Sequence, residues 1–89
     1  MRIRRSKSAI IARILGCIEE ERLFTKTRLM YRANLSFAQL QEYLSLLLEL
    51  ELVREVKEED RTFYEITVKG ERFLEAFRTM KELMTIQNK

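Results

Sequence analysis

Side chains suited to contacting a nucleic acid follow one another closely between residues 36 and 42 of this 89-residue chain. Serine can reach a phosphate or a base edge, and glutamine can form two hydrogen bonds with adenine. Phenylalanine can touch a thymine methyl group or simply pack inside a turn. The candidate DNA contacts of this stretch are Ser36, Phe37, Gln39, Gln41 and Glu42.

Two of these residues also have a purely structural interpretation. Ser36 followed three residues later by Gln39 is a capping box, which predicts a helix beginning at Ser36. Gln41 has no such role and is therefore the best candidate for a base contact. Glu42 would repel phosphate but could accept a hydrogen bond from N4 of cytosine, which favours weak or selective binding.

Basic residues flank this stretch on both sides. Lys26 and Arg28 lie at the start of a predicted helix, where backbone N–H groups attract anions, and Arg32 lies one turn further on. Lys57 and Arg61 flank a predicted hairpin loop and could enter the minor groove, although the loop between them is acidic. A basic N-terminal arm, residues 1–7, is equally compatible with a phosphate contact and with a solvated tail; it contains Arg2, Arg4, Arg5 and Lys7.

Composition excludes several classes of protein. The chain has no histidine, a single cysteine and two glycines, so it can form neither a zinc site nor a glycine-rich phosphate loop. Cys17 falls on an apolar helical face and is expected to be a core residue. We therefore expect no enzymatic activity, no metal and no cofactor. Apolar runs are too short to span a membrane, and we expect a cytoplasmic protein associated with DNA.

Charge is distributed unevenly along the chain, although the net charge is only +3. Residues 1–32 hold nine Lys or Arg and three Glu, whereas residues 33–66 hold three basic and eight acidic residues. The basic first third suggests an acidic partner, most simply the phosphates of a nucleic acid.

Hydrophobic periodicity predicts six elements. Gly16 inside the first helix suggests close packing at that point, and Leu35 is the expected buried residue of the turn after Asn34. No glycine separates the two strands, which predicts a loop longer than a two-residue turn. The expected elements are helices over 8–20 (capped by Ser6 or Ser8), 27–33 (capped by Thr25 or Thr27) and 36–49, strands over 52–57 and 62–67, and a helix from 67 or 68 to about 85.

The last helix carries an apolar seam larger than this small domain can cover. Phe73, Phe77, Met80 and Met84 are spaced 4, 3 and 4 apart, and Leu83 widens the stripe. Part of the seam, near Phe73, must pack on its own domain. The remainder would be an exposed apolar patch, which small proteins avoid. We therefore predict a homodimer through these five residues.

The order of elements describes a mostly α fold with a small β-hairpin, of the α+β class. Three helices, a two-stranded wing and a C-terminal dimerisation helix make a winged helix-turn-helix. We expect one domain over residues 1–89, with the arm at 1–7, the winged-helix core at 8–66 and the dimerisation helix at 67–89.

Two stretches carry a resemblance to a known family. KTRLMYRANLSFAQLQEYLSLLLELELV (26–53) resembles the helix-turn-helix of the archaeal winged-helix family that includes the small chromosomal DNA-binding proteins of Sulfolobus. YEITVKGERFLE (64–75) resembles that family's second wing strand and the start of its last helix, with the widespread T-x-K-G element at Thr67–Gly70. The resemblance implies DNA binding and dimerisation through an antiparallel coiled coil. Glu51 departs from it, because relatives often have glycine there, and the short last helix implies a compact contact.

Two functions are compatible with these observations. The first is a dimeric protein that binds double-stranded DNA, either a transcriptional regulator or a chromatin-type protein. The alternative is a winged-helix module that docks on other proteins, which the acidic loop and Glu42 favour.

Overall fold

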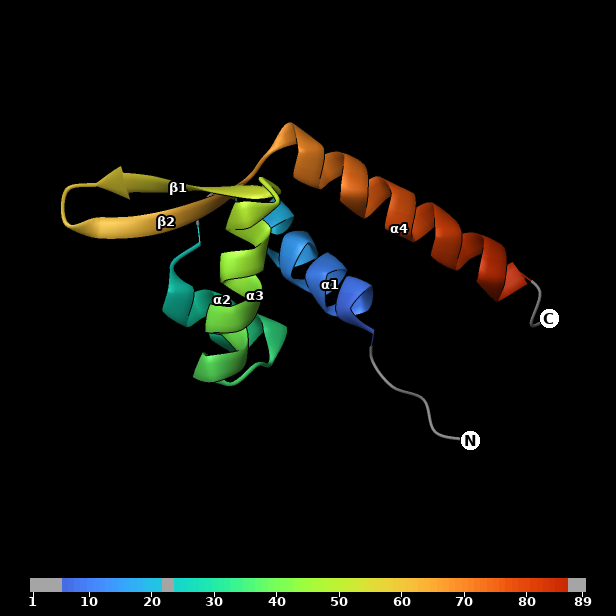
Figure 1. The fold of residues 1–89 in the computed structure, drawn as a ribbon, viewed down its shortest axis with the longest axis horizontal. Helices are drawn as coiled ribbons and strands as arrows, with labels where there is room; N and C mark the ends of the chain where they lie inside the picture. The colour runs from blue at the N-terminus through green and yellow to red at the C-terminus, as the bar shows by residue number, and fades with distance from the viewer. Residues whose placement is uncertain (1–5, 22–23, 87–89) are drawn as a thin grey trace.

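The computed structural model describes residues 6–21 and 24–86, and side chains as far as residue 84. Within these ranges three helices come first, a hairpin follows, and a long helix ends the chain (Figure 1). This is the predicted winged-helix order of elements. The bounds are α1 Lys7–Glu20, α2 Lys26–Ala33, α3 Phe37–Glu49, β1 Val53–Glu58, β2 Arg61–Ile66 and α4 Val68–Ile86.

Short polar side chains set the starts of the first three helices, as predicted. Ser6 accepts a hydrogen bond from the Ala9 N–H, and Thr25 accepts one from the Arg28 N–H. Ser36 and Gln39 form both bonds of the predicted capping box. Because Ser6 is the cap, Lys7 belongs to α1 and not to the N-terminal arm. The other arm residues, Arg2, Arg4 and Arg5, lie outside the described residues.

The turn between α2 and α3 has the predicted conformation. Asn34 adopts a left-handed backbone with φ 60° and ψ 52°, and its N–H returns to carbonyl groups at the end of α2. Leu35 follows with only 9% of its surface exposed. The turn therefore fixes how the exposed start of α3 leaves the core.

The hairpin turn is tighter than the sequence suggested. Glu58 pairs with Arg61 across the antiparallel ladder, so two residues make the turn. The prediction of a longer loop was wrong because Glu59 takes a positive φ of 56° without being glycine. Opposite charges on the facing residues Glu58 and Arg61 favour this register.

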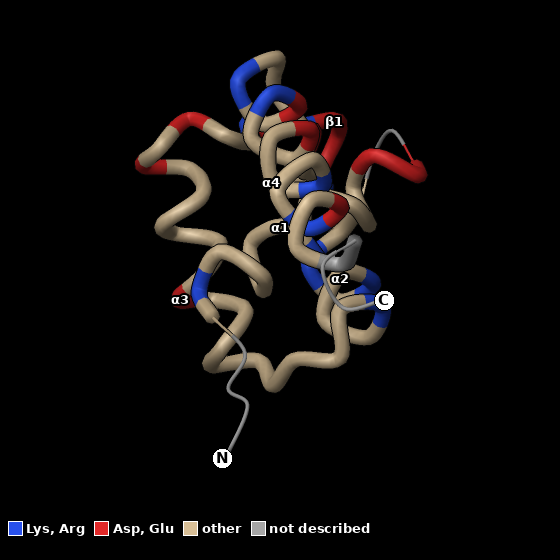
Figure 2. Tube along the Cα trace, turned by 90° about the vertical axis from the view of Figure 1, so that its right-hand side faces the viewer, with Lys and Arg blue, Asp and Glu red and all other residues tan. Residues whose placement is uncertain are grey.

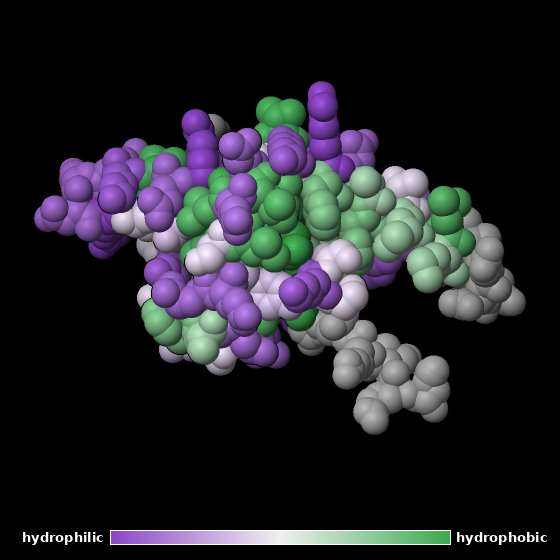
Figure 3. Space-filling model, in the orientation of Figure 1, coloured by the Kyte–Doolittle hydropathy of each residue, from purple (hydrophilic) through white to green (hydrophobic). Residues whose placement is uncertain are grey.

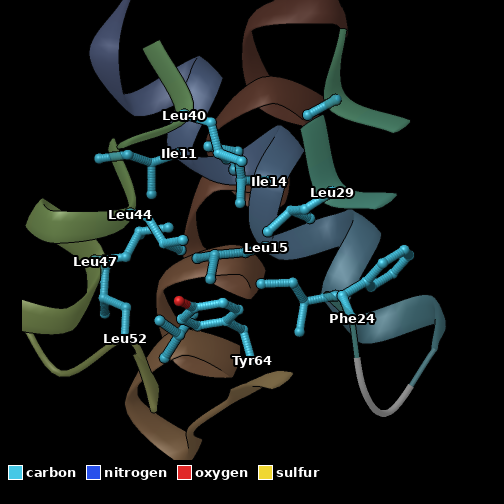
Figure 4. Close-up of a cluster of buried hydrophobic side chains, with 14 of the residues drawn as sticks. Ile11, Ile14, Leu15, Phe24, Leu29, Leu40, Leu44, Leu47, Leu52 and Tyr64 are labelled. Carbon is cyan, nitrogen blue, oxygen red and sulfur yellow. The ribbon is translucent and has the colours of Figure 1, made fainter. Parts of the chain in front are cut away.

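The core forms around α1, which lies behind α3 and beneath α4 (Figures 1 and 4). The fully buried α1 residues Ile14 and Leu15 face leucines of α3. Phe24 is also fully buried and forms an isolated bridge with Tyr64, with N–H to O distances of 2.9 and 3.3 Å. The stretch just before α2 is thus joined to β2.

The T-x-K-G element holds the end of the hairpin against α4. The Thr67 hydroxyl donates to the Glu51 carbonyl (2.7 Å) and accepts from the Gly70 N–H (3.0 Å). Glu51 has a positive φ of 63°, a backbone conformation that glycine adopts more readily than other residues. A Cβ built on Gly70 would lie 2.2 Å from the Leu52 carbonyl oxygen. Only glycine fits at that approach.

Gly16 is different, because close packing there was expected and is not found. A Cβ built on Gly16 would meet only the end of the Arg78 side chain, at 3.8 Å, which is an ordinary contact. The expectation failed because periodicity does not show which helical positions face a neighbouring backbone.

The two glycines give a matched pair of stability predictions. Gly16→Ala should raise the free energy of unfolding by about 1 kcal/mol, since it removes a helix-interior glycine at a site where the new methyl group makes only an ordinary contact. Gly70→Ala should lower it by about 3 kcal/mol, because the new methyl group meets a backbone oxygen. Urea unfolding followed by circular dichroism measures both changes. Equal shifts for the two variants would contradict the packing described above.

Candidate nucleic-acid interface

Lys26 joins the two helices of the helix-turn-helix. Its Nζ donates to Oε1 of Gln41 at 2.6 Å and lies 5.7 Å from the centre of the Phe37 ring. Phe37 is 58% exposed at the first position of α3. Three of the predicted contact residues, from α2 and α3, therefore form one cluster, which we call the Lys26 cluster.

The remaining predicted residues of α3 divide by role. Ser36 and Gln39 are engaged in the capping box, with the Gln39 Oε1 accepting from the Ser36 N–H at 3.0 Å. Glu42 is exposed on the outer face of α3. There, side chains spaced four, three and four residues apart form one stripe along the helix. That stripe consists of Ala38, Glu42, Ser45 and Glu49. Its charge is acidic, and α3 contains no lysine or arginine.

Arg28 and Arg32 have acidic partners at the end of α1. Arg28 forms a two-pronged pair with Glu21, with both nitrogen–oxygen distances at 2.9 Å. Arg32 bonds Glu20 at 2.5 Å. The two guanidinium carbons lie 5.1 and 5.8 Å from the ring centre of the buried Phe24.

Figure 2 shows residues 19–21, in red, on the same side of the molecule as the basic residues of α2. We call Glu20, Glu21, Arg28 and Arg32 the α1–α2 ion network. It neutralises two cations that sequence analysis assigned to phosphate. The roles of the glutamates and Phe24 were not predictable, because residues 7 to 12 apart in the sequence meet here only through the packing of α1 on α2.

The two basic residues of the hairpin lie on opposite faces. Side chains alternate along a strand, so Lys57, paired with Thr62, shares a face with the buried Tyr64. Arg61 lies on the other face, opposite Glu58. The face that carries Tyr64 is turned toward the helices. Lys57 is therefore on the helix side of the hairpin and Arg61 is not.

The predicted seam of α4 is partly covered by the domain. Phe73 and Phe77 are half-buried against the core, whereas Met80, Leu83 and Met84 are 47%, 62% and 60% exposed. Figure 3 shows green and pale green surface continuing along α4 toward its end. The outer face also includes Ala76, which sequence analysis missed because alanine is a weak apolar signal.

Cys17 lines a shallow groove between α1 and α4 and is half-buried. Burial raises the pKa of its thiol above the ordinary value, although the nearby Arg32 opposes this. A raised pKa keeps the sulfur as an unreactive thiol near neutral pH. This agrees with a packing role for Cys17.

The sequence matches the family model described as a winged helix-turn-helix over residues 4–85. The chain belongs to the winged helix-turn-helix family. None of the described helices is both long and apolar enough to cross a membrane. No curated protein matches the sequence.

Solved structures with the same fold include an archaeal DNA-binding protein. Sso10a-2, a DNA-binding protein from Sulfolobus solfataricus, is 28% identical, with a TM-score of 0.75 over 96% of this chain and 90% of that one. This confirms the family resemblance described from the sequence.

Bacterial regulators share the fold at lower identity. MepR, a transcription regulator of a Staphylococcus aureus multidrug efflux pump, is 16% identical, with a TM-score of 0.77 over 88% of this chain and 60% of that one. Lactococcus lactis ZitR, solved in complex with DNA, is 20% identical, with a TM-score of 0.68 over 99% of this chain and 62% of that one. The winged-helix chain thus spans about three fifths of these two regulators.

Proposed function

We propose that this winged-helix protein binds double-stranded DNA as a homodimer, as a transcriptional regulator or a chromatin-type protein. The observation that carries the proposal is the exposed first half of α3 beside the capped start of α2, with Lys26 between them. In helix-turn-helix proteins the second helix enters the major groove by its N-terminal end. The DNA-binding description of Sso10a-2 supports the same conclusion.

The phosphate contacts in this proposal differ in strength from residue to residue. Lys26 stands where the free N–H groups of the first turn of α2 also attract anions. Lys57 adds a cation on the helix side of the hairpin. Arg28 and Arg32 contribute less, because Glu20 and Glu21 already hold them. Arg61 faces away beside Glu58, and Ser36 can reach a phosphate only from its capping position.

Dimerisation through α4 accounts for the exposed apolar seam. Met80, Leu83 and Met84 are each about half exposed in the single chain. Covering the exposed half of these three in both chains would contribute about 5–9 kcal/mol before the cost of association. Phe73 and Phe77 would form the inner part of the same contact. Together these are the five residues predicted for the interface.

Titration with an arbitrary DNA duplex at several salt concentrations tests the DNA-binding proposal. We expect the logarithm of the association constant to fall with the logarithm of salt at a slope of about −3.6 or steeper, since two lysines in each of two chains displace counterions. Lys57→Ala should flatten this slope. Lys69→Ala removes the same charge from the first turn of α4, which lies above the base of the hairpin whereas α2 lies below it (Figure 1), and should leave the slope unchanged.

Protein docking is a second candidate, which the acidic outer face of α3 and the neutralised arginines favour. The same titration separates the two functions. Absence of binding at about 50 mM salt, where electrostatic attraction is strong, would reject DNA binding and favour docking. As part of this proposal, we expect the protein to be cytoplasmic and associated with DNA. The proposed function involves no cofactor, no metal and no catalysis.

A further inference from the structure

The Lys26 cluster fixes how the Gln41 amide is oriented. A lysine ammonium can only donate hydrogen bonds, so the group that faces it at 2.6 Å must be the Gln41 oxygen. The Gln41 NH₂ group is therefore turned away from Lys26. Gln41 is exposed, so its two N–H donors are open to a ligand, whereas its oxygen already accepts one hydrogen bond from a positively charged group.

Lys26 is itself held in place by two groups of α3. One N–H is directed to Gln41 and the ammonium lies over the Phe37 ring. Lys26 is half-buried, which limits the positions its ammonium can take. An ammonium has three N–H donors, so at least one stays available beside the Gln41 NH₂ group. The two side chains together present adjacent donors.

Adjacent donors match guanine better than adenine. In the major groove guanine presents two acceptors, N7 and O6, whereas adenine presents the acceptor N7 and the donor N6–H₂. The two-bond contact of glutamine with adenine needs the amide oxygen to accept from N6. Here Lys26 already donates to that oxygen, and its positive charge disfavours the approach of a second N–H donor on the remaining lone pair.

We propose that Lys26 is a positioning residue that makes Gln41 read guanine and not adenine in the major groove. This rests on the proposed DNA binding. It also agrees with the neighbouring Glu42, since a carboxylate accepts from N4 of cytosine, the partner base of guanine. The ligand feature recognised is thus a G·C pair facing the first turns of α3.

Selection of binding sites from a random duplex library, at one salt concentration, tests this inference. We expect the wild-type protein to enrich guanine at one position of each half-site. Lys26→Met keeps the side-chain stem over Phe37 but removes the donors, which frees the Gln41 oxygen. The ratio of guanine to adenine at that position should then fall by about tenfold, the scale of one good base contact.

Lys57→Met is the matched control, because it removes the same charge from the hairpin. It should weaken binding without changing the preferred base. Replacing the selected guanine by 7-deazaguanine, which lacks the N7 acceptor, should weaken the wild type, because one of the two adjacent donors then loses its acceptor. A purely structural role of Lys26 would lower affinity for every sequence alike.

The outcomes separate this inference from the proposed function. Binding of DNA by the wild type with no guanine preference, or with a guanine preference that Lys26→Met retains, would overturn the role of Lys26 and leave DNA binding intact. If the wild type binds no duplex at low salt, both the function and the inference are rejected. Circular dichroism of Lys26→Met confirms that the variant is folded.

Discussion

Leu83→Glu is expected to convert the proposed dimer into a monomer and to weaken binding to a two-site duplex by at least about 100-fold. Leu83 is 62% exposed on the outer face of α4, so the substitution leaves the fold of the single chain undisturbed. In the proposed dimer it would place a carboxylate from each chain in an apolar seam, where an unpaired charge is strongly unfavourable. A monomer also loses the gain in affinity that comes from binding two half-sites together.

Light scattering and DNA titration measure the two effects. The wild type should have twice the 10.7 kDa mass of a single chain, and Leu83→Glu should have the mass of a single chain. Val68→Glu is the matched control, since Val68 is 66% exposed at the start of the same helix but outside the seam. A wild-type monomer at micromolar concentration, or the same loss of dimer in both variants, would reject the proposed interface.

Replacing Glu20 and Glu21 together by glutamine is expected to strengthen DNA binding by about tenfold at moderate salt. The change releases Arg28 and Arg32 from their carboxylate partners, and each arginine that then contacts phosphate steepens the salt slope by about 0.9. The variant should lose about 1 kcal/mol of stability or less, because these are surface ion pairs.

Glu19→Gln is the control for this change. Glu19 stands on the same helical turn, but it pairs with Arg78 of α4 at 3.3 Å and not with α2. Glu19→Gln removes one acidic charge from the same region, but the arginine that it releases is Arg78 of α4. Equal strengthening by Glu19→Gln would show a general charge effect, and an unchanged salt slope in the double variant would show that the two arginines do not reach DNA.

The positions of the helices could be predicted from the sequence because their signals are local. The hydroxyl groups of Ser6, Thr25 and Ser36 bond N–H groups within their own first turn, so the caps can be recognised from spacing alone. Asn34 ended α2 for a similar local reason, its tolerance of a left-handed backbone. Apolar periodicity then separated buried from exposed faces.

Features that depend on contacts between distant segments were not predictable. Phe24 pairs with Tyr64 through a single bridge, which leaves no alternating pattern in the sequence. The partners of Arg28 depend on how α1 ends beside α2. Gly70 is required by the Leu52 carbonyl, whereas Gly16 has room for a methyl group beside Arg78, and the sequence does not distinguish them.

The candidate site was predicted in outline but not in its internal bonds. Lys26, Phe37 and Gln41 were each predicted separately as candidate DNA contacts, but their association was not foreseen. Long polar side chains choose partners according to the packing of the helices that carry them. Residue type in the sequence therefore suggested which side chains would contact DNA. The packing of α2 on α3 in the structure suggests which hydrogen-bond donors these side chains present.

Mapping of backbone amide shifts by NMR, on addition of a DNA duplex at low salt, tests the central claim most directly. Contact through the helix-turn-helix predicts shifts concentrated at residues 25–28, at residues 36–45 and on the outer part of the hairpin, fading as salt is added. Shifts confined to α4, or none at a concentration of DNA that saturates other winged-helix proteins, would contradict it.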